Sequence, residues 1–162
     1  MRRDEPGPGQ ESVWDYPRPP RVERCLRRVR IVHAGIAIAD STRALRVLET
    51  SHPPGIYLPP ADVRTDLLER TSTGTWCEFK GHADYWRLAA DGAAVRDAAW
   101  SYPNPTAAFE EIRDHLSFYP GRVDACFLDD EPVIPQEGGF YGGWITGDIV
   151  GPFKGAPGTL GW

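Results

Sequence analysis

Glycine and proline recur along the whole chain and limit how long its helices and strands can be. The 162 residues include 17 glycines and 16 prolines, about 20% of the chain, where ordinary domains have about 12%. Both residues interrupt regular secondary structure. The fraction stays below the roughly 25–30% typical of low-complexity disorder. The sequence therefore predicts a folded, turn-rich domain of short elements and excludes a coiled-coil or collagen-like chain.

The charge of the chain is acidic overall. Lys and Arg total 18 against 23 for Asp and Glu, which gives a formal net charge of −5. Because nucleic-acid binding depends on an excess of positive charge, a nucleic-acid partner is disfavoured. Every apolar stretch is far shorter than the roughly 20 residues needed to cross a bilayer, and no signal-peptide pattern opens the chain. We expect a soluble, cytoplasmic protein with no membrane partner.

Cysteines and histidines are scattered through the sequence. The three cysteines form no Cys-x-x-Cys pair, and the four histidines occur singly. Structural zinc sites and disulfide frameworks depend on such close pairs. The P-loop, His-Glu-x-x-His and Gly-x-Ser-x-Gly motifs are absent as well. We therefore expect no metal site and no cofactor, with the thiols reduced.

Composition divides the chain into three segments. Residues 1–28 combine a proline-rich stretch with an arginine-dense one and predict an N-terminal arm, in which the arginines form a solvated face rather than an anion-binding patch. Residues 29–134 predict the folded β domain. Residues 135–162 contain nine glycines interleaved with five aromatic residues. Since each aromatic side chain can bury roughly 150–250 Å², this segment is expected to be a coil packed on the domain.

Alternating apolar residues predict two β-hairpins. Residues 29–38 alternate on either side of Ala34-Gly35, and residues 85–101 alternate on either side of Asp91-Gly92. Such pairs are typical of two-residue hairpin turns. Residues 64–74 predict a turn-rich passage between the two hairpins.

Shorter elements are expected elsewhere. Residues 56–58 and 123–128 predict strands, and residues 44–50 are compatible with either a strand or a helix. One short helix is predicted in residues 106–116, because Thr106 can cap its N-terminus and apolar side chains follow at helical spacing.

The residues best suited to catalysis or ligand binding are concentrated between Thr75 and Trp86. Lys80 follows Phe79 and precedes a glycine. Among aromatic side chains a lysine can lose its charge and act as a nucleophile or base, or keep the charge and hold an anion. It can equally be a surface residue beside a turn. Cys77 is either a thiolate beside that cation or an inert small apolar residue, and the tryptophans are either core or pocket walls.

Several separate blocks of the central region resemble a known family. They are Ala39-Asp40-Ser41-x-Arg43-Ala44-Leu45-x-Val47-Leu48-Glu49, Pro53-Pro54-x-x-Tyr57-x-Pro59, Thr75-x-Cys77-x-Phe79-Lys80-Gly81-x-Ala83-x-Tyr85-Trp86 and Ala99-Trp100-Ser101-Tyr102-Pro103-x-Pro105. In this order and spacing they resemble the domain of unknown function 427 family over about residues 29–130.

The resemblance implies a mainly β fold: two small antiparallel sheets in a β-tent-like arrangement, similar to the thalidomide-binding domain of cereblon and to methionine sulfoxide reductase B, here with one short helix. The zinc of those proteins is not carried over, because this chain lacks their paired Cys-x-x-Cys motifs. By analogy with the aromatic cage of the first, Trp86 and Trp100 are candidate cage residues. The family also carries a nucleotidyltransferase-like label. This chain lacks the Gly-Ser followed by spaced aspartates that would support that label.

These observations favour a small-molecule-binding β domain with an aromatic pocket that contains a lysine. The candidate catalytic residues are Lys80, Glu49 and Tyr102, with Lys80 as electrostatic stabiliser or amine and the other two as proton carriers. The candidate ligand-binding residues are Arg43, Tyr57, Cys77, Tyr85, Trp86 and Trp100. A metal-independent reaction of unknown type, and assembly into a homo-oligomer, are left open. The alternative is a non-enzymatic protein interaction module that uses the C-terminal aromatic coil.

Overall fold

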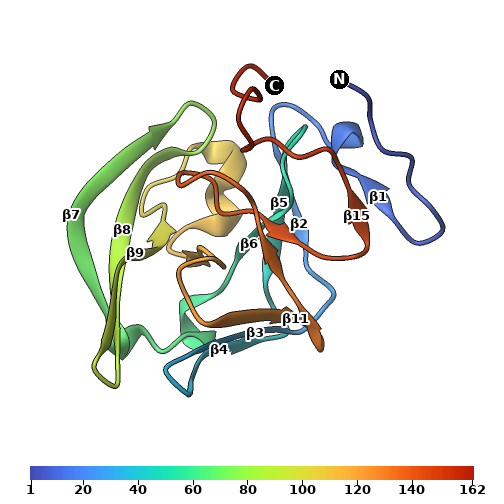
Figure 1. Ribbon diagram of the computed structural model, residues 1–162. Coiled ribbons are helices and arrows are strands. Elements are labelled where there is room, and N and C mark those ends of the chain that lie inside the picture. The colour runs from blue at the N-terminus through green and yellow to red at the C-terminus, as the bar shows by residue number, and fades with distance from the viewer.

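A computed structural model describes all of residues 1–162 and contains several small sheets (Figure 1). The largest is antiparallel, in the order β10-β9-β8-β7. A second antiparallel sheet has the order β12-β11-β3-β4, and a third has the order β2-β5-β6. Two strand pairs complete the fold: β13 with β14, and the parallel pair β1 with β15.

The longest strands are β7, β8 and β9 of the first sheet, and the other strands are short. The first sheet contains β7 (Leu68–Cys77), β8 (Gly81–Ala90), β9 (Ala93–Ser101) and β10 (Ser117–Phe118). The second contains β3 (Val29–His33), β4 (Ile36–Ser41), β11 (Ala125–Leu128) and β12 (Glu131–Pro132), and the third β2 (Arg21–Arg24), β5 (Leu45–Leu48) and β6 (Gly55–Tyr57). The paired strands are β1 (Glu11–Ser12), β13 (Ile134–Pro135), β14 (Trp144–Ile145) and β15 (Ile149–Val150).

The mainly β fold is confirmed, with a difference in its helical content. Besides the two four-stranded antiparallel sheets there are the three-stranded sheet and the two strand pairs. The helices are short 3₁₀ segments: η1 (Val13–Asp15), η2 (Pro60–Asp62), η3 (Thr65–Leu67) and the kinked η4 (Ala107–Ile112). The helix predicted in residues 106–116 is thus the short η4, and residues 44–50 contain strand β5.

Both predicted hairpins form around residues with positive φ. Ala34 and Gly35 have φ of 52° and 73°, and Asp91 and Gly92 have φ of 45° and 78°. Two successive residues of this kind match the right-handed twist of the strands they connect. The turns therefore set the register in which β3 pairs with β4 and β8 with β9.

The prediction of a turn-rich passage in residues 64–74 is wrong for residues 68–74, which form most of β7. β7 is an edge strand of its sheet, and from Leu68 to Cys77 it has no fully buried side chain. An edge strand with little burial does not need alternating apolar residues, so the sequence carries no strand pattern there. In Figure 1, β7 and β8 form a long curved pair along one side of the molecule.

The interior holds two main groups of buried side chains. The larger is formed mostly by the first two sheets and includes Ile31, Leu88 and Phe118, together with Trp144 from the C-terminal part of the chain. The smaller group is rich in tyrosine and lies between strands β5 and β6 and one face of β8 and β9. It consists of Val47, Tyr57, Ala83, Tyr85, Tyr102, Phe109, Ile112 and Tyr119.

Both ends of the chain are joined to the rest of the fold. β2 pairs with β5, and β1 pairs with β15 near the C-terminus. Several arginines of the N-terminal stretch are engaged in ion pairs, such as Arg28 with Asp40 at 2.6 Å. The division at residues 28 and 134 stays a prediction. No helix in the structure has the length and apolar character required to span a membrane.

Candidate functional site

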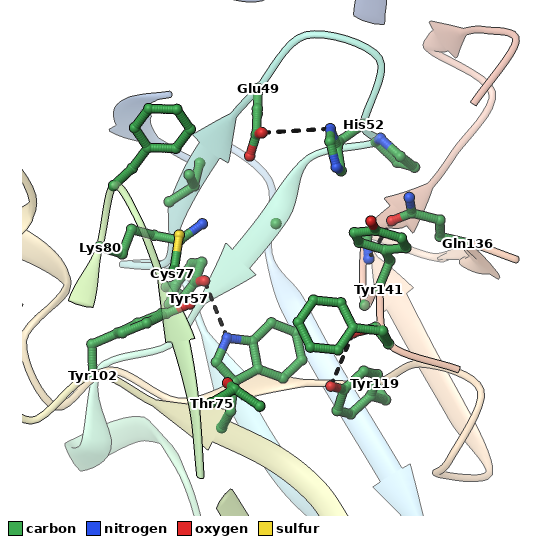
Figure 2. Close-up of a pocket in the computed structure, with 18 of the residues that line it drawn as sticks. Glu49, His52, Tyr57, Thr75, Cys77, Lys80, Tyr102, Tyr119, Gln136 and Tyr141 are labelled. Atoms are coloured by element: carbon green, nitrogen blue, oxygen red, sulfur yellow. Dashed lines mark hydrogen bonds and ion pairs between the residues drawn. The ribbon is translucent and has the colours of Figure 1, made fainter. Parts of the chain in front are cut away.

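A cavity of about 290 Å³ opens above the tyrosine-rich group of buried side chains. This volume lies near the lower end of the roughly 300–1,000 Å³ typical of small-molecule sites. Figure 2 shows Lys80, Cys77 and Tyr57 on one side of it, Gln136 and Tyr141 on another, and Glu49 and His52 along a third. Its lining comprises Val47, Glu49, His52, Pro53, Gly55, Tyr57, Thr75, Trp76, Cys77, Glu78, Phe79, Lys80, Tyr85, Trp100, Tyr102, Tyr119, Gln136, Phe140, Tyr141, Gly142, Gly143 and Lys154.

The aromatic floor of the pocket follows from strand register. Tyr85 on β8 lies directly opposite Trp100 on β9, so the two side chains share one face of the sheet. The indole Nε1 of Trp100 donates a hydrogen bond of 3.2 Å to the Tyr57 hydroxyl, and its ring packs on that of Tyr119 with a centroid distance of 4.6 Å. Tyr57 also lies 6.3 Å from the ring of Tyr102.

The turn between β7 and β8 directs Lys80 into this pocket. Gly81, the next residue, has a φ of +101°, a backbone conformation that glycine adopts without strain. Thr106 anchors the turn from outside: its Oγ1 donates to the carbonyl of Phe79 at 2.6 Å, and its N–H donates to the carbonyl of Lys80 at 3.2 Å. The Lys80 backbone is therefore held on both sides of the side chain that enters the cavity.

The ammonium of Lys80 contacts an aromatic ring but has no hydrogen-bond or ion-pair partner in the protein. Its Nζ lies 5.8 Å from the centre of the Tyr102 ring, and it makes neither a hydrogen bond nor an ion pair with any protein acceptor. Desolvation by itself lowers the pKa of Lys80, but nearby Tyr57, Cys77 and Glu49 outweigh it, and the net pKa is raised. The nearby Glu49 carboxylate favours the ammonium form of Lys80, which supports the role of anion holder over that of amine nucleophile.

The tyrosines around Lys80 are neutral phenols. Burial raises the pKa of Tyr57 and of Tyr102 above the ordinary value. Neutral hydroxyls donate and accept hydrogen bonds without adding charge. This neutrality speaks against Tyr102 as a proton-accepting group, because its phenolate is disfavoured.

His52 lines the same cavity and has one ring nitrogen without a hydrogen-bond partner in the protein. Its Nδ1 lies 2.9 Å from the carbonyl oxygen of Thr50, and because a carbonyl only accepts, Nδ1 carries the proton. Burial is the main reason that the pKa of His52 is lowered; Lys154 and Lys80 add to this, and Glu49 opposes it. In the neutral ring Nε2 then keeps its lone pair. The Glu49 carboxylate lies 3.9 Å from Nδ1.

Most of the pocket lies in a region that matches a known protein family. The model of a family described as "Domain of unknown function (DUF427)" matches residues 21–129, about two thirds of the chain. This chain belongs to the DUF427 family. No curated protein matches it. The DUF427 match covers β2 to β11 and therefore supplies the aromatic floor, Lys80, Glu49 and His52.

The remaining side of the pocket comes from residues 136–154, beyond the DUF427 match. Gln136 holds this segment together, because its amide donates to the carbonyl of Lys154 and its Oε1 accepts from the N–H of Gly143 at 3.1 Å. The hydroxyl of Tyr119 donates to the carbonyl of Phe140 at 3.1 Å. The pocket of this DUF427 protein is thus completed by a C-terminal segment that is attached by hydrogen bonds.

Seven of the nine residues predicted for the site line this one cavity: Lys80, Glu49, Tyr102, Tyr57, Cys77, Tyr85 and Trp100. Arg43 lies elsewhere and pairs with Asp62 in the DUF427 domain, with an Nη2–Oδ1 distance of 2.8 Å. Trp86 also lies outside the pocket. It follows Tyr85 on β8 and so points to the other face, where its Nε1 donates to Ser101 at 2.9 Å and its ring packs on the larger core.

Several lining residues were not predicted, among them His52, Tyr119, Gln136, Tyr141 and Lys154. Only one of them had a visible signal in the sequence. The triplet Phe-Lys-Gly occurs at residues 79–81 and again at 153–155, and its two lysines are the only ones in the chain. Both lysines line this pocket. No group of three or more His, Cys, Asp or Glu side chains is arranged to hold a metal.

The lowered pKa of His52 predicts a pH dependence of stability. A histidine that binds its proton less tightly when folded takes up that proton on unfolding below its unfolded pKa of about 6.5. The free energy of unfolding therefore falls as the pH drops through this value. His52→Asn keeps a donor for the Thr50 carbonyl and removes the titration, so urea unfolding between pH 7.5 and 5 should show a smaller loss of stability than the parent. Parallel curves for the two proteins would contradict the assigned burial of His52.

Proposed function

We propose that this chain binds a small molecule that carries an aromatic or other apolar ring and an anionic group. The Lys80 ammonium carries this proposal, because it is a charged donor that enters an aromatic cavity without a protein acceptor. A partly desolvated charge without a partner is costly. An anion in the cavity would provide the missing partner.

The ring of the ligand would lie on the aromatic floor. Trp100, Tyr57 and Tyr119 line the cavity, and Trp100 packs edge-to-face on Tyr57 and at a tilt on Tyr119. Aromatic pairs in edge-to-face or offset geometry are favourable by about 0.5–1.5 kcal/mol beyond the burial of their area. The pocket therefore combines a slot for a ring with one charged group that orients it, which is the usual design of a small-molecule site.

A reaction on the bound molecule would draw on the same groups. Lys80 is suited to stabilise a developing negative charge, and Glu49 stays a candidate proton carrier. His52, with an unshared lone pair on Nε2, is better suited than Tyr102 to accept a proton. Whether the chain is an enzyme is left open. The alternative of an interaction module stays a prediction, and we favour ligand binding because the C-terminal segment lines the pocket.

Binding of 3-phenylpropionate, compared with its uncharged amide, tests the proposal. Calorimetry on the parent protein should detect the acid and find the amide at least tenfold weaker. In Lys80→Met the acid should lose about 10- to 100-fold in affinity, because a hydrogen bond to a charged group contributes about 1.5–3 kcal/mol. The amide should bind Lys80→Met and the parent alike.

Arg43→Met is the matched control, since it removes a cation whose partner, Asp62, lies outside the pocket. Its affinity for the acid should equal that of the parent. The proposal is wrong if neither compound binds the parent at millimolar concentration, if acid and amide bind equally, or if Arg43→Met weakens the acid as much as Lys80→Met does.

A further inference from the structure

The polar end of the pocket contains an anion as well as a cation. Glu49 has a half-buried carboxylate whose only ion-pair contact is His52 at 3.9 Å. It accepts no hydrogen bond within the protein. Lys80 and Glu49 are close enough for the carboxylate to raise the pKa of the lysine, yet they form no ion pair with each other. Each of the two opposite charges is therefore available to a ligand.

The acceptors of the cavity are grouped apart from its free donor. Figure 2 shows the Glu49 carboxylate next to His52, while Lys80 approaches from the strand that carries Cys77. His52 also lines the cavity and approaches Glu49 through Nδ1 at 3.9 Å, and its Nε2 keeps a lone pair because the Nδ1 proton is directed to the carbonyl of Thr50. A ligand group with several N–H donors can use both acceptors at once.

We propose that the ligand of this pocket is a zwitterion: a ring-bearing molecule with a carboxylate at Lys80 and an ammonium at Glu49 and His52. This inference rests on the proposed function and specifies its ligand class as that of an aromatic α-amino acid. A purely anionic ligand would leave the Glu49 charge unpaired and would be repelled by it. A purely cationic ligand would leave the Lys80 charge unpaired and would be repelled by it.

The charges on the outer part of the pocket do not alter this balance. Lys154 lies over the ring of Tyr141 at 5.5 Å, and its Nζ donates to the main-chain oxygen of Trp162 at 3.3 Å. Glu78 lines the pocket from an exposed position on the turn. Together they add one positive and one negative charge, so the pocket as a whole is electrically balanced, as a zwitterion requires.

Three compounds with the same ring and chain length separate the possibilities: L-phenylalanine, 3-phenylpropionate and phenethylamine. On the parent protein we expect L-phenylalanine to bind about tenfold more tightly than either of the others. In Glu49→Gln the advantage of L-phenylalanine over 3-phenylpropionate should fall to about one. In the same variant 3-phenylpropionate should bind at least as well as to the parent, because a repelling charge has been removed.

Glu111→Gln is the matched control for Glu49→Gln, since it removes an exposed carboxylate that lies outside the pocket. It should keep the tenfold preference. If 3-phenylpropionate binds the parent as tightly as L-phenylalanine does, the zwitterion inference is overturned while the proposed function stands. If neither of them binds, the proposed function itself fails. Loss of the preference in both glutamate variants would also overturn the assignment of Glu49.

Discussion

Replacement of Trp144 with alanine is expected to lower the free energy of unfolding by about 3–5 kcal/mol, the usual cost of removing a fully buried aromatic side chain. Trp144 is 1% exposed and packs in the larger core. Its indole Nε1 donates to the carbonyl of Phe118 at 3.1 Å, and its backbone N–H donates to the carbonyl of Pro54 at 2.9 Å. The substitution would leave a cavity and strip the Phe118 carbonyl of its donor.

Guanidinium unfolding followed by circular dichroism measures this loss, and the melting temperature should fall by about 6–20 °C. Trp76→Ala is the matched control, because Trp76 is 72% exposed and an exposed substitution changes stability by about 0.5 kcal/mol or less. Equal denaturation midpoints for the two variants would show that Trp144 does not contribute to the core as described.

The position of Trp144 changes what the C-terminal part of the chain is expected to do. Trp144 lies beyond the residues that match the family, which end at 129, yet its side chain belongs to the larger core. The sequence predicted a coil packed on the domain, and five aromatic residues among nine glycines were the reason. Which of the five would enter the core could not be foreseen, because each is flanked by similar residues and the contacts are distant along the chain.

The hairpins were predictable because local sequence determines them. In β3 and for most of β8, buried and less buried side chains alternate along the strand, so apolar residues alternate. The turn residues Ala34-Gly35 and Asp91-Gly92 mark the positions at which the chain reverses direction. β7 lacked such a pattern because it is an edge strand with little burial.

The helix expected after Pro105 illustrates a limit of periodicity. Phe109 and Ile112 are buried and three residues apart, a spacing that suits one face of a 3₁₀ turn as well as an α-helix. Phe109, with a non-helical φ of −116°, kinks the element, and Asp114, with a φ of 58°, lies just beyond its end and keeps it short. The chain then turns back so that Leu116 pairs with Leu58. That pairing is a tertiary contact without a local signal.

The candidate site was partly predictable for a related reason. Consecutive residues of a strand point to opposite faces, so Tyr85 and Trp86 could not both line one pocket, and alternation alone would have removed one of them. Register then assigns Trp100 to the face of Tyr85. The contributions of His52 and of residues 136–154 depend on long-range packing, which the sequence pattern does not encode.

Replacement of Gly155 with alanine is expected to detach the C-terminal side of the pocket and to cost about 2–6 kcal/mol, from backbone strain and from steric overlap of about 1–3 kcal/mol each. Gly155 has a φ of +128°, and a Cβ there would overlap the carbonyl oxygen of Glu137. The neighbouring residues Gln136 and Lys154 are joined by a hydrogen bond and both line the cavity. The overlap therefore separates two chain segments, around residues 137 and 155, that form one side of the pocket.

Gly158→Ala separates the two causes, because Gly158 has a φ of +86° but open space around its Cβ position. It carries the strain without the overlap, so it should lose less stability than Gly155→Ala and should bind 3-phenylpropionate as the parent does. Gly155→Ala should weaken that binding, since the overlap displaces lining residues. If the two variants match in both melting temperature and affinity, then contact between residues 137 and 155 does not hold the pocket closed, and the cavity depends on the family domain alone.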